Sequence, residues 1–190
     1  KFLMDFYTTT HPYYPIAVAE IMNPLDIMHA TPTLYYVPKQ ETLREYNENF
    51  GDELYLIEER PMSAFENGIF GTPQDIVSTD DMLAEINKNK NIKVDKDAYM
   101  RARLFDMLIG DWDRHSDQWR WGMYKENEQT IYRPIPRDRD QAFPRYDGLF
   151  FKVIMGIPPL RHMQDFKDDI HNVKWFNREP YPLDLAILES

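Results

Sequence analysis

The chain has 190 residues, 43% of them hydrophobic and 14% aromatic, which suits one folded domain and is too short for two comfortable ones. Its formal net charge of -10 argues against broad nucleic-acid binding, because such binding needs a cationic surface. The sequence lacks cysteine, which excludes disulfides and thiol chemistry, and no apolar run reaches the roughly 20 residues of a membrane-spanning helix.

The N-terminal part predicts short helices followed by two strands. Residues 11–30 place apolar side chains at helical spacing but contain Asn23-Pro24, so we expect two short helices. The stretches "TLYYV" (33–37) and "ELYLIEERP" (53–61) predict strands on either side of a charged helical segment. Residues 62–77 contain two glycines and a proline without clear periodicity, and we expect a loop.

The strongest helix signal begins after Asp95, a good N-cap residue, and stops at Gly110, and we expect this helix to be buried. A shorter helix precedes it, with Ser78 at a cap position. After the long helix, "QWRWGMY" (118–124) and "TIYRPIP" (130–136) predict a β-hairpin around a polar turn. An apolar periodic stretch near the C-terminus predicts a final helix.

The predicted hairpin brings two charged segments together. If its turn is centred near Asn127, Gln118 faces Pro136, and alternation places Gln118 and Asp138 on one face of the hairpin. Trp119, Trp121 and Met123 then point into the core from the other face. The segment "RDRD" (137–140) therefore returns beside "DWDRHSD" (111–117).

Carboxylates gathered in a small space repel one another, so something must offset their charge. Eight of the twelve arginines lie between residues 101 and 145. They suit either a structural salt-bridge network or a site in which a divalent cation binds carboxylates and phosphate. Composition alone leaves both alternatives open.

A helix ending in "LIGDWDRHSDQW" and a hairpin followed by "PIPRDRDQAF" resemble the catalytic segment of the atypical protein-kinase-like fold. That group includes phosphoinositide kinases, HipA toxin kinases, secretory-pathway kinases and spore-coat CotH kinases. The resemblance implies an α+β fold that is a partial protein-kinase-like fold. We expect mainly the helical larger lobe, with a catalytic-loop β-hairpin and a remnant of the smaller lobe.

The resemblance assigns roles to the acidic positions. Asp113 stands where the family's catalytic Asp orients the hydroxyl nucleophile. Asp138 lies five residues before Phe143, and the same spacing separates the family's Mg²⁺-binding Asp from a Phe. Gln118 replaces a metal-binding Asn, and Asp140 resembles the second acid of the CotH variant. The resemblance thus implies Asp113 as the catalytic residue, ATP and Mg²⁺ as cofactors, and three metal ligands: Asp138, Gln118 and Asp140.

Supporting residues and lobes follow from the same resemblance. Arg114 and Arg137 are expected to bind phosphate or support the loop together with His115, whose role is expected to be architectural. Glu20 is a candidate for the ion pair of the smaller lobe. We expect residues 1–61 to form small-lobe-like helices and strands with a hinge strand. Residues 62–190 then form the large-lobe-like helical region with the catalytic-loop hairpin, in one compact unit.

Three functions stay open, so the sequence does not decide whether the chain is an enzyme. The first is a kinase-like domain with ATP- and Mg²⁺-dependent phosphotransfer to an unknown acceptor. The second is a non-catalytic, degenerate kinase-like scaffold, which Gln118 and the lack of a glycine-rich phosphate loop favour. The third is a metal-dependent phosphoesterase that uses the same carboxylates.

The whole chain also resembles a segment of bacterial envelope proteins in which such a region accompanies a calcineurin-like phosphoesterase domain or an outer-membrane barrel. That likeness implies a soluble domain in the cell envelope or periplasm, whose partners are neighbouring domains of the same longer chain. Lys1 at the start and the uncapped apolar stretch at residues 183–190 also favour an internal fragment. We expect neither nucleic-acid binding nor direct membrane insertion.

Overall fold

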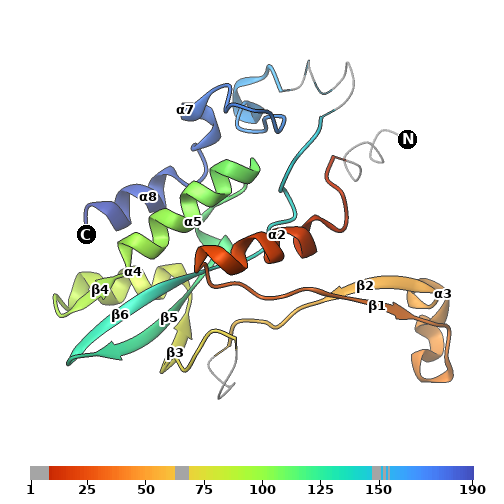
Figure 1. Ribbon diagram of the computed structural model, residues 1–190, viewed down its shortest axis with the longest axis horizontal. Coiled ribbons are helices and arrows are strands. Elements are labelled where there is room, and N and C mark those ends of the chain that lie inside the picture. The colour runs from red at the N-terminus through yellow and green to blue at the C-terminus, as the bar shows by residue number, and fades with distance from the viewer. Residues whose placement is uncertain (1–8, 63–68, 147–150, 152, 154) are drawn as a thin grey trace.

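In the computed structural model, residues 9–62, 69–146, 151, 153 and 155–190 are described (Figure 1). They form a mixed α+β structure, as expected for the fold class, with two separate sheets of strand order β1-β2 and β3-β5-β6-β4. The elements follow the chain in this order, with η marking 3₁₀ helices: α2 (Tyr14–Met22), η1 (Asn23–Leu25), β1 (Thr33–Val37), η2 (Glu41–Tyr46), α3 (Asn47–Phe50), β2 (Glu53–Ile57), β3 (Asp75–Val77), α4 (Thr79–Lys88), β4 (Ile92–Val94), α5 (Lys96–Ile109), η3 (Ser116–Gln118), β5 (Trp119–Glu126), β6 (Gln129–Pro136), η4 (Pro158–Leu160), α7 (Val173–Phe176) and α8 (Tyr181–Leu188).

The predicted hairpin is present as β5 and β6, but its register differs by one residue from the expected one. The turn consists of Asn127 and Glu128, both with positive φ angles of 46° and 69°, as a two-residue hairpin turn requires. Pro136 therefore pairs with Trp119 instead of Gln118. The expectation that alternation puts Gln118 and Asp138 on one face is wrong, because a two-residue turn pairs even with odd positions.

Two short strands extend the hairpin into a four-stranded sheet. β3 pairs antiparallel with β5, and β4 pairs parallel with β6. β3 lies within the expected loop at residues 62–77, so that prediction is wrong for residues 75–77. A three-residue strand is too short to show alternation in the sequence. Residues 63–68 of the same loop lie outside the described residues.

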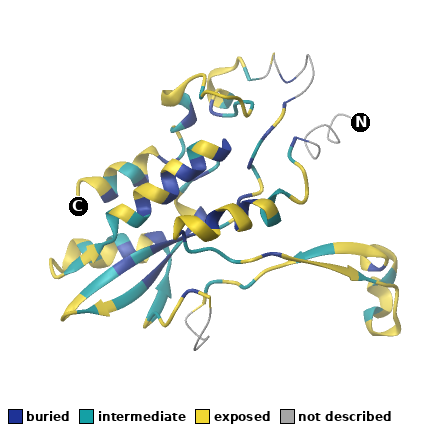
Figure 2. Ribbon diagram, viewed as in Figure 1, coloured by how far each residue is buried: buried dark blue, intermediate teal, exposed yellow. Residues whose placement is uncertain are grey.

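The core lies between this sheet and α5, as the dark blue segments of Figure 2 show. Trp119 and Trp121 are fully buried, as expected, and the ring of Tyr99 on α5 lies 5.0 Å and 5.8 Å from theirs. The expectation that α5 is buried holds for one side only. Leu104 and Leu108 are 60% and 66% exposed, because the described elements do not cover that side.

Both ends of α5 match their predicted signals. The side chain of Asp95 accepts a hydrogen bond from the Ala98 backbone N–H at 2.9 Å, which caps the N-terminus. Gly110 has a φ of 72°, the left-handed conformation that commonly ends a helix. The chain therefore leaves the helix sharply and enters the acidic loop at Asp111.

The N-terminal helices and strands also form where expected. α2 ends at Met22, and Pro24 lies in the following 3₁₀ turn. Val18 and Met22 are buried in the same core as α5, so α2 packs onto the main body. At the other end of the chain, the predicted final helix is α8, in which Asp184 accepts a hydrogen bond from the Tyr99 hydroxyl at 2.7 Å. No helix in the described part of the chain is long and apolar enough to cross a membrane.

The β1–β2 ribbon stands apart from this body (Figure 1). Its strands pair only with each other among the described residues, with Tyr35 opposite Tyr55. Large apolar side chains on it are open to solvent, with Tyr36 58% exposed, Leu54 52% and Ile57 54%. A two-stranded ribbon of this kind gains little stability from its own contacts.

Candidate functional site

A buried carboxylate on α5 anchors the region of the acidic loops. Asp106 is fully buried, and its carboxylate lies within 3.3 Å of three guanidinium groups: Arg103 at 3.1 Å, Arg114 at 3.3 Å and Arg139 at 2.7 Å. Burial alone would raise the pKa of Asp106, but these arginines hold it below its ordinary value. A structural salt-bridge network, one of the two alternatives that the sequence left open, is therefore present beneath the site.

Arg114 connects the two acidic loops. Its side chain is fully buried, and its Nη1 atom donates to the backbone oxygens of Arg137 at 2.6 Å and Asp138 at 3.3 Å. Its Nη2 atom donates to the backbone oxygen of Gln118 at 3.2 Å. The guanidinium also lies 4.9 Å from the ring centroid of Trp119. Of the two roles expected for Arg114, these contacts are those of loop support.

Asp111 lies at the base of the first acidic loop and is fully buried. Burial raises its pKa to about 7, although the charge of Arg114 opposes the shift. Its Oδ1 atom accepts a hydrogen bond from the backbone N–H of Asp113 at 3.3 Å. Its Oδ2 atom lies 3.7 Å from Arg114 but has no hydrogen-bond partner among the described residues. Asp111 thus holds the backbone that carries Asp113.

Asp113, the predicted catalytic residue, lies at the surface of this network with 29% of its side chain exposed. Burial raises its pKa, and the charges of Asp138 and Glu179 add to the increase, while His115 and Arg114 oppose it. The Nε2 atom of His115 lies 3.8 Å from the Asp113 Oδ1 atom. Asp113 is therefore a half-buried acid next to other carboxylates, in contact with solvent.

The second acidic loop presents Asp138 and Asp140 to solvent and turns Arg139 inward. Asp138 has a φ of 52°, an unusual backbone conformation for a residue other than glycine. Partial burial raises the pKa of Asp140, and the charges of Asp138 and Asp113 raise it further. Asp113, Asp138 and Asp140 are therefore brought together, although they come from two loops.

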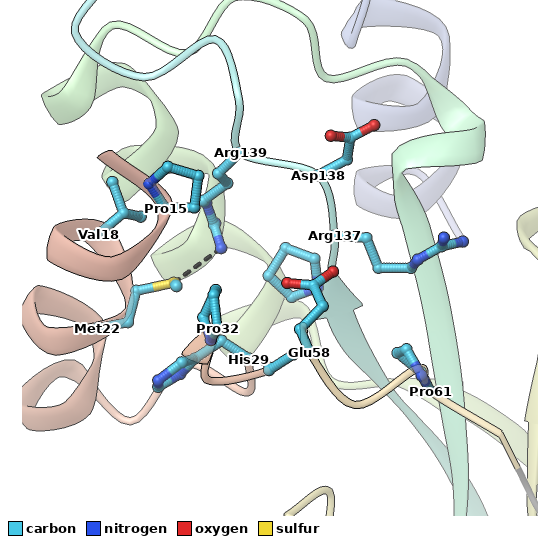
Figure 3. Close-up of a pocket in the computed structure, with 12 residues that line it drawn as sticks. Pro15, Val18, Met22, His29, Pro32, Glu58, Pro61, Arg137, Asp138 and Arg139 are labelled. Carbon is cyan, nitrogen blue, oxygen red and sulfur yellow. Dashed lines mark hydrogen bonds between the residues drawn. The ribbon is translucent and has the colours of Figure 1, made fainter. Parts of the chain in front are cut away.

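A fourth acid, Glu58, approaches from the segment that follows β2. Although its side chain keeps some contact with solvent, partial burial raises its pKa, as does the charge of Asp138. Figure 3 shows Glu58, Asp138 and Arg137 around one hollow, with the Arg137 side chain directed away from the carboxylate of Asp138. This hollow has a volume of about 40 Å³, enough for water but far below the size of a ligand pocket.

Three other predicted residues, Gln118, His115 and Glu20, lie away from this hollow. Gln118 is buried, and its Nε2 atom lies 3.4 Å from the Nε2 atom of His115. The Nδ1 atom of His115 accepts from the backbone N–H of Asp117 at 3.3 Å, which fits the architectural role expected of this histidine. Glu20 is exposed on α2 and makes no ion pair with any other described residue.

Among the described residues, no group of three or more His, Cys, Asp or Glu side chains is arranged to hold a metal ion. The acids do supply the hard oxygen ligands that Mg²⁺ prefers, and Mg²⁺ commonly uses only one or two protein carboxylates. Asp138 with Asp140 or Asp113 satisfies that smaller requirement in chemistry and number.

Glu58 and Glu179, which the sequence does not single out, both interact with acids of the loops: Glu58 with Asp138 and Glu179 with Asp113. Glu58 follows β2 and Glu179 precedes α8, so neither has a fixed spacing from Asp113 or Asp138 in the sequence. No pattern of charge or hydrophobicity marks either residue. Only the folded arrangement brings them to the site.

Comparisons of the chain with the profiles of known protein families, with curated proteins and with solved structures found no match.

Proposed function

We propose that the chain is a kinase-like domain that transfers phosphate from ATP to a hydroxyl acceptor with the help of Mg²⁺. The observation that carries the proposal is the convergence of Asp113, Asp138 and Asp140 at one end of the β5–β6 hairpin. The charge of Asp138 raises the pKa of both Asp113 and Asp140, and no arginine of the described residues forms an ion pair with any of the three, unlike at Asp106. A divalent cation would offset this repulsion.

The roles follow from the position of each residue. Asp113, half-buried beside His115, orients the acceptor hydroxyl and accepts its proton. Asp138 and Asp140 would hold Mg²⁺, which neutralises charge on the phosphates when it is bound. Arg114 keeps the two loops at a fixed separation through its bonds to the backbone of residues 137 and 138. Phosphoryl transfer depends mainly on positioning and charge neutralisation, and these are the two roles given to the residues named above.

Gln118 has a different role in this proposal from the one that the family resemblance implies. Its amide contacts His115, and its backbone oxygen accepts hydrogen bonds from Arg114 and from the N–H of Arg137 at 2.9 Å. We assign it to the support of the loop, so metal binding depends on the aspartates. Replacing Gln118 with Asn then weakens the packing of His115 and does not improve Mg²⁺ affinity.

The test is a phosphotransfer assay with labelled ATP and a panel of hydroxyl acceptors. We expect Mg²⁺-dependent turnover that Asp113→Asn and Asp138→Asn each reduce by at least about 100-fold. Asp168→Asn is the matched control, because Asp168 is exposed in a loop. Absence of turnover with every acceptor, or equal turnover in all variants, would contradict the proposal.

A second substrate distinguishes the phosphoesterase alternative from the kinase proposal. An aryl phosphate supplied with Mn²⁺ but without nucleotide is hydrolysed by a phosphoesterase and not by a kinase. Hydrolysis that is lost in Asp138→Asn would replace the kinase proposal with the phosphoesterase. No hydrolysis, together with nucleotide-dependent turnover, would support the kinase.

The exposed ribbon favours a second candidate function, a docking scaffold without catalysis. Tyr35, Tyr36 and Leu54 expose about half of their surface on a ribbon that stands off the body, and exposed apolar surface of this extent marks interaction sites. Neighbouring domains of an envelope protein are the partners expected from the sequence. In this case Asp113→Asn is functionally silent, whereas Tyr36→Ser with Leu54→Ser abolishes association with those domains.

A further inference from the structure

β4 lies at the edge of the four-stranded sheet, and no strand pairs with its outer side among the described residues (Figure 1). Directly after β4, the backbone N–H of Asp95 donates to the oxygen of Tyr132 on β6 at 2.9 Å. Backbone groups of successive residues in a strand point to opposite sides, so those of Lys93 also face β6, whereas the N–H and C=O of Val94 face outward. The outer edge of β4 therefore offers a donor and an acceptor at Val94 to a further strand.

A hollow of about 820 Å³ lies at this edge, which is within the size range of ligand-binding pockets. All three residues of β4 line it, as do the apolar side chains of Ile86 on α4 and Ile131 on β6. Ile92 and Val94 are half-buried, and their side chains pack against the core. The outward backbone groups of Val94 thus adjoin a space that can hold several residues of an extended peptide.

Most charged side chains that line the hollow already have partners. Arg133 forms ion pairs with both Asp95 at 3.4 Å and Glu126 at 2.5 Å. The Nζ atom of Lys96 donates to the backbone oxygen of Leu188 at 3.3 Å. These groups are therefore occupied within the chain itself.

Lys90 and Lys93 also line the hollow, and neither forms an ion pair with any described residue, in contrast to Lys39 and Lys88. The remaining acid of the lining, Asp97, lies in the first turn of α5, where the helix dipole favours a negative charge. A second copy of the chain is a poor occupant, because pairing of two β4 edges about a twofold axis sets Lys93 opposite Lys93 of the other copy. A strand with an acid opposite Lys93 complements this edge instead.

We propose that the outer edge of β4 binds an extended peptide segment of a partner protein, in which acidic and apolar residues alternate, by addition of a strand to the sheet. The peptide backbone pairs with the outward N–H and C=O of Val94. Its acidic residue opposite Lys93 shares the face of that lysine, and its apolar neighbours share the face of Ile92 and Val94. The inference does not depend on phosphotransfer, because β4 pairs with residues 130–132, whereas the acidic loops adjoin residues 118 and 137 at the other end of the hairpin.

The test is amide hydrogen exchange of the full chain, followed by NMR, with a short synthetic peptide of alternating valine and glutamate as the probe. We expect the peptide to slow exchange of the outward Val94 amide at least about tenfold, and to change that of Lys93, which faces β6, much less. The same peptide with methylated backbone nitrogens is the control for strand pairing. The same peptide with lysine in place of glutamate is the control for charge.

Two variants test the backbone and the charges separately, with peptide affinity measured by fluorescence anisotropy. Val94→Pro removes an N–H that does not face β6, a position where an edge strand tolerates proline, and we expect it to weaken binding at least about tenfold. We expect Lys90→Glu with Lys93→Glu to weaken binding by a similar factor. Lys167→Glu with Lys174→Glu is the matched control, because it changes the net charge equally on exposed lysines outside the hollow. Circular dichroism checks that each variant is folded.

Protection of the Val94 amide by the glutamate peptide, but not by the methylated or lysine peptides, supports the inference whether or not the chain transfers phosphate. No protection of that amide, or equal affinity of the glutamate and lysine peptides for the unmodified chain, would overturn it. Equal affinity of the Lys90 and Lys93 double variant and its control would mean that these lysines only guard the edge against pairing, which would also overturn it.

Discussion

At the residue scale, Arg114 links the buried network to the surface acids with one guanidinium group. It contacts the carboxylates of Asp106 and Asp111 on one side and the backbone of residues 137 and 138 on the other. The same group therefore neutralises buried charge and sets the separation of Asp113 and Asp138. Stability and site geometry depend on it together.

We expect Arg114→Met to lower the free energy of unfolding by about 3 to 5 kcal/mol. The substitution leaves two buried carboxylates with less compensation, and such unpaired charge is strongly destabilising. Urea unfolding of both proteins measures the difference. Arg120→Met is the control, because its partner Asp117 is exposed, and we expect a loss below about 1 kcal/mol. Equal losses in the two variants would show that Arg114 is not the central contact.

The raised pKa of Asp111 leads us to expect that the stability of the chain depends on pH. Burial raises its pKa to about 7 in the folded chain, above the ordinary value of 3.8, so the folded state binds more protons than the unfolded state between these values. The contribution of Asp111 to stability is therefore present at low pH and is lost as pH rises to about 7. Asp111→Asn removes this titration.

From pH 5 to pH 8, we expect Asp111→Asn to gain about 2 to 3 kcal/mol of stability relative to the unmodified chain. Urea unfolding at several pH values measures this gain as a difference between the two proteins, which cancels the titration of groups that do not interact with Asp111. A difference that stays constant with pH would mean that Asp111 is ionised throughout the range.

At the element scale, the hairpin and α5 form a rigid base for the site. Trp121 packs under Tyr99, and its Nε1 atom donates to the Thr79 hydroxyl at 3.1 Å, which ties the hairpin to α4. We expect Trp121→Ala to lower the free energy of unfolding by about 3 to 5 kcal/mol, because it leaves a large cavity. Leu104→Ala on the exposed side of α5 is expected to cost less than about 1 kcal/mol. Chemical denaturation compares the two, and similar costs would contradict the assignment of the core.

The sequence allowed α5, α8 and the hairpin to be predicted because their signals are local. A cap at Asp95, a glycine at 110 and alternating tryptophans each constrain a few consecutive residues. The register was missed by one residue, since polar residues 125–129 fit more than one turn. The short strands β3 and β4 give no local pattern, and their pairing comes from contact with the hairpin.

The candidate site was predictable in part for the same reason. Asp113, Asp138 and Asp140 stand in recognisable motifs, and the hairpin brings their loops together. Asp106, the centre of the buried network, lies inside an apolar helical run that gives no reason to single it out. Glu58 approaches from a distant segment after β2. Such contacts depend on tertiary structure, so the spacing of residues along the chain does not predict them.

At the scale of the whole molecule, the ribbon and the body differ in their expected stability. The β1–β2 strands have no third strand or covering helix among the described residues, whereas β5 and β6 lie over the core. We expect amide hydrogens of residues 33–37 and 53–57 to exchange much faster than those of β5 and β6. Hydrogen exchange followed by mass spectrometry tests this, and equal protection would show that the ribbon is held by other contacts.

The small hollow beside Asp138 also requires movement if a nucleotide binds there. A volume of about 40 Å³ is far below the roughly 300 Å³ or more of typical ligand pockets, so the segment at residues 58–61 has to shift away from the hairpin. Because β2 ends at Ile57, directly before this segment, such a shift would link the ribbon with the site.

The most direct test of the central claim is calorimetric titration of ATP with Mg²⁺ into the unmodified chain, Asp138→Asn and the control Asp168→Asn. We expect Mg²⁺ to strengthen ATP binding by the unmodified chain and the control, and Asp138→Asn to lose at least about tenfold in affinity under the same conditions. Binding of ATP that neither Mg²⁺ nor Asp138 affects, or no binding at all, would contradict it.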